Sequence, residues 1–342
     1  MLKRIAAVVI IVCMAVFVTG CQNPVTIFLD WINGGGDSLE APETDTLPGE
    51  DLEVDGAVGA RIRDTVLYYR DSDGYLVPVS VNIEWEEGIA RAALQRLISD
   101  TDLSVMAQDT GLYSAVPEGT EVLGLTIRDG LAKVDLSAEA LNYGTVKEEE
   151  LMLNSVVYTL TEFNTVDSVQ FMIEGDVMET LKFGTSTSGP IEREDINTAG
   201  DVAGSRVTIY FHRTNEKGYE YFVPVTLGTG TAGEDMDAAL KCLLGGPPGG
   251  SGLKSSIPDN VSINGMGIKN GIAYLNFGKG IFDYKGGDSV AENIVKSIAL
   301  TLKEYPAVTG VVFLVDGQPA QLPTGVVLES VIDVPVFANE YH

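Results

Sequence analysis

The apolar residues of this chain follow one pattern twice. Five of them recur at helical spacing in the stretch 151–175, and five more do so 142 positions later; the two sets are Leu153, Val156, Val157, Leu160 and Phe163, and Val295, Ile298, Ala299, Leu302 and Tyr305. Such a stripe predicts a helix of about four turns with one buried face. A polar break and a short alternating run follow, at 169–173 and again at 311–315, and this run predicts a strand. A helix that leads directly into a strand is therefore built twice.

Each copy also contains a tight hairpin. Asp129-Gly130 separates two alternating runs in the first copy, and Asn270-Gly271 does the same in the second. These dipeptides favour a two-residue turn, because both central positions need a positive φ. The register of both hairpins is thereby fixed.

Two further strands and a shorter helix precede each hairpin. The strands are predicted within 65–81 and 207–226, around residues typical of turns. The triplet Val77-Pro78-Val79 returns in the second pair, and it indicates a strand at or near a sheet edge because proline cannot donate to a ladder. Apolar stripes at 90–98 and 236–244 then predict a helix in each copy.

The two copies together predict an α+β protein of two tandem repeats, each with the order β-β-α-β-β-α-β. Two amphipathic helices among alternating strands favour a mixed β-sheet with both helices packed on it. We place the first domain at 62–196, a linker at 197–206 and the second domain at 207–342. Each run of about 130 residues is long enough to bury a core and fold alone.

The amino-terminal stretch has the layout of a secretory leader. Lys3 and Arg4 precede an apolar run, and small residues then lead to Cys21. We interpret 1–20 as a lipoprotein signal peptide and Cys21 as the lipidated residue; the alternative is an uncleaved membrane anchor. The segment 34–60 carries eight acids, no Lys or Arg and few large apolar residues, so we expect 21–61 to be a disordered tether that holds an extracytoplasmic protein near the cell membrane. The hydrophobic cluster at 25–31 either rests in the membrane interface or is an arbitrary start of this tether.

The net charge of the chain is −27, from 22 basic and 49 acidic residues. We expect no nucleic-acid partner, since neutralising phosphates requires a basic patch. The acidity accounts for solubility and is compatible with a partner that presents a cationic surface.

No set of residues has the spacing of a familiar catalytic or metal site. His212 follows a predicted strand in a turn-like sequence, where a histidine is ordinarily solvated, and Cys242 lies beside an apolar stripe as a small semi-buried thiol. The segment 71–74 is similar to the start of a calcium loop, but Asn82 stands where the twelfth-position glutamate is needed. We therefore predict no catalytic residue, no metal and no cofactor, and we expect the protein not to be an enzyme.

The order of these segments resembles the GerM domain family of sporulation and spore germination proteins, in its two-copy lipoprotein form. The resemblance rests on the Val-Pro-Val triplet at 77–79, on Arg91-Ala92-Ala93-Leu94, and on the segment 158–163 followed by Val169-Gln170-Phe171, with their counterparts in the second half. It covers residues 62–340 and the leader ending at Cys21, and it brings no catalytic residues with it. It implies an envelope lipoprotein of an endospore-forming bacterium that acts in spore formation or germination.

Three classes of function are compatible with the sequence. The first is a non-enzymatic scaffold or binding module, held to the membrane by lipidated Cys21, for an envelope protein assembly or for peptidoglycan. The alternatives are a peptidoglycan-active hydrolase, since some carboxylate pair among 49 acids will have glycosidase separation, and a lipoprotein that binds a soluble ligand in a deep apolar pocket. The two copies share stripes, turns and prolines rather than reactive side chains, which favours the first class.

Overall fold

The fold is that of a computed structural model that describes residues 62–341 except 85–87, 99–100, 201–203, 231–235, 260, 324–326 and 329. The predicted signal peptide, Cys21 and the tether lie outside the described residues. The chain forms two compact units. One lies within Val54–Asn260, Tyr284–Ala307 and Val334–His342, and the other within Val261–Asp283 and Val308–Asp333.

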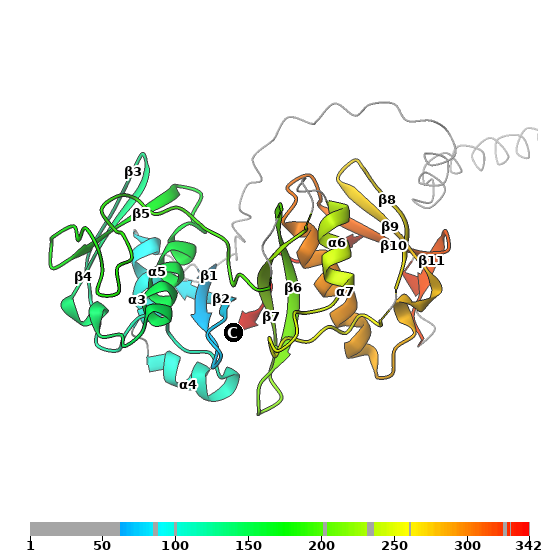
Figure 1. Ribbon diagram of the computed structural model, residues 1–342, viewed down its shortest axis with the longest axis horizontal. Coiled ribbons are helices and arrows are strands. Elements are labelled where there is room, and N and C mark those ends of the chain that lie inside the picture. Colours follow the sequence, from blue (N-terminus) through cyan, green and yellow to red (C-terminus); the bar gives the residue numbers. More distant parts are fainter. Residues whose placement is uncertain are drawn as a thin grey trace, which may run out of the picture. The chain divides into compact units, whose positions relative to one another are not determined.

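The first repeat has the predicted order of elements and one additional helix (Figure 1). Its elements are β1 (Ile62–Arg70), β2 (Leu76–Glu84), α3 (Ile89–Ile98), α4 (Thr101–Thr110), β3 (Val122–Arg128), β4 (Gly130–Leu136), the 3-10 turn η1 (Ala138–Leu141), α5 (Val146–Leu160) and β5 (Val166–Ile173). The sequence does not predict α4 because its few apolar residues form no stripe. Asp129 and Gly130 take φ values of 50° and 78°, as the predicted hairpin turn requires.

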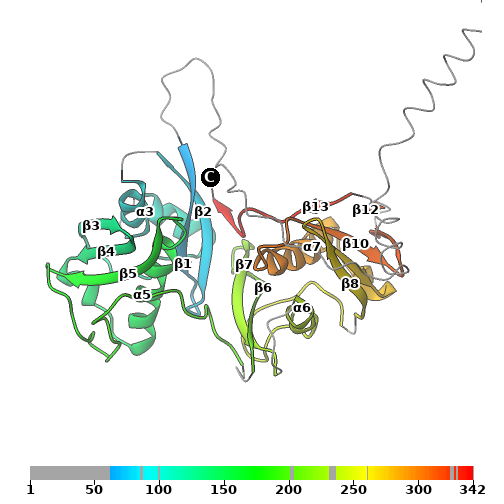
Figure 2. The same cartoon turned by 90° about the horizontal axis from the view of Figure 1, so that it is seen from above.

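The strands of the first repeat divide between two sheets, where the sequence pattern predicts one. β1 and β2 form an antiparallel hairpin, whereas β3, β4 and β5 form a separate mixed sheet in that order, with β4 and β5 parallel. In both views α3 and α5 lie between the hairpin and this second sheet (Figures 1 and 2). The two helices therefore bury apolar residues on both sides.

The outer edge of β1 shows why the two sheets do not join. Ser155 Oγ of α5 donates to the carbonyl of Tyr68 (2.6 Å), and the Tyr68 N–H donates to Thr159 Oγ1 (3.1 Å). Hydroxyl groups of the helix thus occupy backbone groups that a further strand would need.

Helices cover the hairpin of the second repeat in the same way. β6 (Arg206–Thr214) and β7 (Glu220–Gly228) form a hairpin that contacts α6 (Met236–Leu244) and α7 (Asp288–Lys303). The Tyr210 N–H donates to Thr301 Oγ1 (3.1 Å), so α7 covers β6 as α5 covers β1. A two-residue strand, β14 (Glu340–Tyr341), completes this unit.

The other unit is a sheet of its own. Its elements are β8 (Ile263–Lys269), β9 (Ile272–Phe277), the 3-10 turn η2 (Lys279–Phe282), β10 (Gly310–Val315), β11 (Gln318–Gln321), β12 (Val327–Leu328) and β13 (Ile332–Asp333). β8 and β9 are antiparallel and β9 and β10 are parallel, as in the first repeat, and Asn270 and Gly271 take φ values of 51° and 77°. The rings of Phe277 and Phe313 stack with centroids 6.2 Å apart.

Buried positions follow the predicted stripes. Leu94, Leu97, Val156 and Leu160 are fully enclosed in the first repeat. No helix in the described part of the chain is long and apolar enough to cross a membrane.

Glu149 is fully enclosed in the first repeat. The two carboxylate oxygens of Glu149 accept hydrogen bonds from the backbone N–H groups of Phe183 (2.8 Å) and Thr185 (3.1 Å) and so hold that loop on α5. Burial raises the pKa of Glu149, but the hydrogen bonds from Thr185 and Phe183 outweigh burial, and the pKa lies below its usual value.

Candidate functional site at the junction between the repeats

The hairpins of the two repeats meet through β2 and β7 and bury a matched pair of apolar clusters. The first cluster is Tyr68, Leu76, Tyr158 and Ile196; the second is Tyr210, Phe222, Leu300 and Ala338. Each member of the first has its counterpart 142 or 146 positions later in the second (68 and 210, 76 and 222). The duplicated sequence therefore forms a duplicated surface, and we call the place where the two meet the junction.

Two asparagines connect the hairpins across the junction. Asn197 accepts from the Leu76 N–H (2.8 Å) and donates to the carbonyls of Leu76 (2.7 Å) and Pro224 (2.8 Å). Asn339 accepts from the Phe222 N–H (2.7 Å) and donates to the carbonyls of Phe222 and Pro78, both at 2.8 Å. Each of these junction asparagines thus binds one hairpin twice and the opposite proline once. The reciprocity is that of a two-fold interface made within one chain.

The segments that carry the junction asparagines add to the opposite hairpins. β14 runs parallel to β2, with Glu340 opposite Ser80, and the Ser80 N–H donates to the carbonyl of Asn339 (2.8 Å). Correspondingly, the Thr226 N–H of β7 donates to the carbonyl of Ile196 (2.9 Å), and the Ala199 N–H donates to the carbonyl of Thr226 (3.2 Å). Figure 2 shows the C-terminus beside β2. The first residues of the predicted linker are therefore part of the junction.

A pair of tyrosine–glutamate contacts repeats the symmetry. Tyr68 Oη donates to Glu162 Oε1 and Tyr210 Oη donates to Glu304 Oε1, both at 2.9 Å. Burial and then the neighbouring glutamate raise the pKa of each tyrosine well above its usual value, so both hydroxyls remain donors. In the first repeat Arg193 joins the pair, with Nη2 at 2.5 Å from Glu162 Oε1.

An ion pair makes the junction asymmetric. Asp71 is 0% exposed, and its Oδ2 lies 2.9 Å from Arg213 Nη1 and accepts from Tyr221 Oη at 3.1 Å. Its Oδ1 accepts from the N–H groups of Asp73 and Tyr75 (2.9 Å each), so the predicted turn at 71–74 is formed. Both carboxylate oxygens of Asp71 therefore accept hydrogen bonds. Positions 71 and 213 are equivalent in the duplication, 142 apart, yet carry opposite charges.

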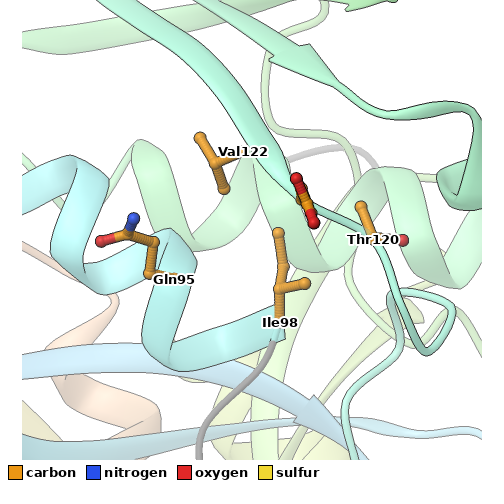
Figure 3. A pocket seen from close by; sticks show the side chains of 5 residues that line it. Gln95, Ile98, Thr120 and Val122 are labelled. Carbon is orange, nitrogen blue, oxygen red and sulfur yellow. The ribbon is translucent and has the colours of Figure 1, made fainter.

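Two polar cavities of this unit lie mainly on the first repeat. The larger, about 1320 Å³, is bounded by the turn at 73–76, by α5, by residues 185–198 and by 250–252. The smaller, about 220 Å³, lies between α3 and the start of β3 and is shown in Figure 3. Neither is the deep apolar pocket that a small-molecule receptor needs.

His212 is not the solvated turn residue that the sequence suggests. It lies within β6 and is 5% exposed, because the strand continues to Thr214 before the chain turns. Its Nε2 lies 3.0 Å from Ser256 Oγ, and its Nδ1 lies 2.8 Å from Glu220 Oε1. Burial lowers the pKa of the imidazole below its usual value.

His212 thus lies between a hydroxyl and a carboxylate, the order of contacts found in a catalytic triad. Its burial, at 5% exposed, leaves the ring little access to a substrate. Glu220 also accepts from Asn293 Nδ2 (2.7 Å), which ties β7 to α7. These contacts therefore tie β6 and β7 to neighbouring segments of the chain.

The remaining reactive residues give no site. Cys242 is half-buried, as predicted, and burial raises the pKa of its thiol, which disfavours a thiolate nucleophile. No group of three potential metal ligands occurs within the described ranges. The junction asparagines were not among the predicted residues.

Two segments of the chain, 66–179 and 208–321, match the family model Germane, described as sporulation and spore germination. The chain belongs to this family. Each matched segment contains one hairpin of the junction, so the family pattern and the structural duplication agree.

Two proteins are similar to most of the chain. It is 29% identical over 345 aligned positions to the spore germination protein GerM of Bacillus subtilis (strain 168), with 93% of each chain covered. Its structure is similar to that of the tandem GerMN domains of the sporulation protein GerM from Bacillus subtilis, with a TM-score of 0.69 and 28% identity over 82% of this chain and 100% of that one. The predicted family and the predicted α+β fold of two tandem repeats are thereby confirmed.

Proposed function

We propose that this member of the sporulation and spore germination family is a non-enzymatic scaffold or binding module of the cell envelope. The junction is the observation that carries the proposal. Asn197 and Asn339 bind backbone groups of the two hairpins, and Tyr68 and Tyr210 donate to Glu162 and Glu304, so these duplicated residues hold the two repeats together. When two binding modules are held in one chain, binding of the first raises the effective concentration of the second at the partner assembly, a gain that neither module has alone.

The proposal includes a lipid anchor at Cys21 on the extracytoplasmic side of the cell membrane. It is supported by the charged start, the apolar run and the small residues before Cys21. Two or more acyl chains suffice for stable attachment, since each buried methylene contributes about 0.8 kcal/mol.

The proposed partners are envelope proteins or peptidoglycan. The larger polar cavity beside the junction offers hydroxyl, amide and charged side chains rather than an apolar pocket, which suits an extended polar partner. The net charge of −27 disfavours nucleic acid and anionic lipid surfaces.

Spore formation by cells carrying single substitutions tests the proposal. Ser256→Ala and the matched control Ser255→Ala should both leave spore yield and protein abundance unchanged, because a scaffold does not depend on one nucleophile. Purified protein should give no clearing in a zymogram against cell wall. Loss of spores with Ser256→Ala alone, at normal abundance, or clearing of the wall would favour a hydrolase instead.

A further inference from the structure

The outer strand of the second sheet in the first repeat is an open edge. β3 lies at the end of the order β3-β4-β5, and no described residue pairs with the outer side of 123–128. The strand contains no proline and no charge before Arg128, and its side chains Leu123 and Ile127 are 43% and 37% exposed. Edge strands are ordinarily protected by charge, proline or cover, so an apolar open edge is a template for another strand.

A bulge limits which part of the edge can be used. The ladder between β3 and β4 shifts between Val122 and Gly124, and from Gly124 to Arg128 it is regular. An added strand could therefore pair with about five residues beyond the bulge, which is an ordinary strand length.

The smaller cavity lies at the start of this edge (Figure 3). Ile98 of α3 and Val122 of β3 line it as its small apolar part, with Gln95 and Thr120 beside them. Glu121 is the one charged residue among those that line it. Arg91 of the same helix is already engaged, since its Nη2 donates to the carbonyl of Val122 (2.8 Å).

We infer that β3 and this cavity form a docking site for an extended segment of an envelope partner protein, which adds to β3 as a strand and places a lysine or arginine in the cavity. The aliphatic stem of such a side chain packs on Ile98 and Val122 while its cation reaches Glu121. Backbone pairing supplies affinity and the cavity supplies specificity. The inference rests on the proposed binding function and names its kind of partner; the strongly acidic chain attracts a cationic segment.

The second repeat has no acid at the position that corresponds to Glu121. Lys241 stands at the position equivalent to Gln95, and Ser262 stands at the position equivalent to Glu121. The acid is lost and a base is introduced, so the docking site belongs to the first repeat only.

Binding of two synthetic peptides to the full-length protein tests the site. One is an acetylated six-residue peptide of alternating lysine and valine, and the other has glutamate in place of lysine. We expect the lysine peptide alone to bind, and amide hydrogen exchange to slow within 122–128. Glu121→Lys should weaken its binding about tenfold, whereas Glu118→Lys, which changes the net charge equally three residues away, should weaken it less than about twofold.

Equal weakening of peptide binding by the two variants would show nonspecific attraction to an acidic protein and would refute the docking site. Protection from hydrogen exchange outside 122–128, or binding of the glutamate peptide, would refute it as well. Ile127→Lys supplies a second variant, because a charge added to the edge should block strand addition without touching the cavity. A wall-degrading activity would refute the proposed scaffold function without altering these binding measurements, so the two failures are distinguishable.

Discussion

Replacing Asn339 with alanine tests the junction most directly, because one side-chain amide holds three backbone partners. Asn339 is 5% exposed, and it serves the N–H and carbonyl of Phe222 and the carbonyl of Pro78. Alanine leaves these three buried backbone groups without that partner. A net hydrogen bond contributes about 1 kcal/mol and an unsatisfied buried group costs somewhat more, so we expect the free energy of unfolding to fall by about 3 kcal/mol.

Urea unfolding of the full chain, followed by circular dichroism, measures this loss. The midpoint should fall while the slope stays unchanged, because the surface exposed on unfolding is the same. Asn264→Ala is the matched control: that side chain is exposed and donates to Asp316 Oδ1 at 3.2 Å, so its loss should cost less than about 0.5 kcal/mol. A loss below about 1 kcal/mol for Asn339→Ala would refute the view that the junction asparagines hold the hairpins together.

Three further predictions concern attachment and pH. Cys21→Ala should move the protein from the membrane fraction to the soluble fraction; a variant that stays with the membrane would contradict lipidation at this residue. Burial lowers the pKa of His212 below 6.5, so the unfolded state binds more protons than the folded state does. The free energy of unfolding should therefore fall as the pH drops below about 6.5. In His212→Asn, the free energies of unfolding from urea titrations at about pH 5 and pH 7 should differ less than in the original protein. The pKa of Glu149 is lower in the folded state than the value of 4.5 in the unfolded state, so this residue stabilises the fold above pH 4.5, and the stabilisation is lost as the pH falls through the folded pKa. Glu149→Gln should therefore have a lower free energy of unfolding at about pH 7 but lose less of it on acidification.

Local patterns in the sequence predict the order of elements because stripes and turns act over a few residues. The apolar stripe of α5 and the pair Asp129-Gly130 are examples, and both appear as predicted. The grouping of strands into sheets depends instead on what covers the edge of β1. The residues that do so, Ser155 and Thr159, lie 87 and 91 positions from Tyr68 and carry no local signal of that role.

The junction asparagines show the same limit more strongly. Asn339 binds Phe222 from 117 positions away and Pro78 from 261 positions away. The sequence does contain one clue, since Asn197 and Asn339 are separated by the repeat distance of 142 and each follows an apolar residue. His212 was mispredicted for a related reason: a turn-like composition does not end a strand when cross-strand pairing, here Thr214 with Glu220, continues past it.

The charges at positions 71 and 213 explain how two such similar surfaces meet in one defined way. The shared tyrosines, asparagines and apolar clusters would fit a first repeat against another first repeat as well as against a second. At this equivalent position, however, the first repeat carries Asp71 and the second carries Arg213, and the two are joined at 2.9 Å. Pairing of two first repeats would bring two buried carboxylates together, and pairing of two second repeats would oppose two guanidinium groups. Like charges at such a site cost several kcal/mol, so the ion pair selects the first repeat for the second and rejects the alternatives.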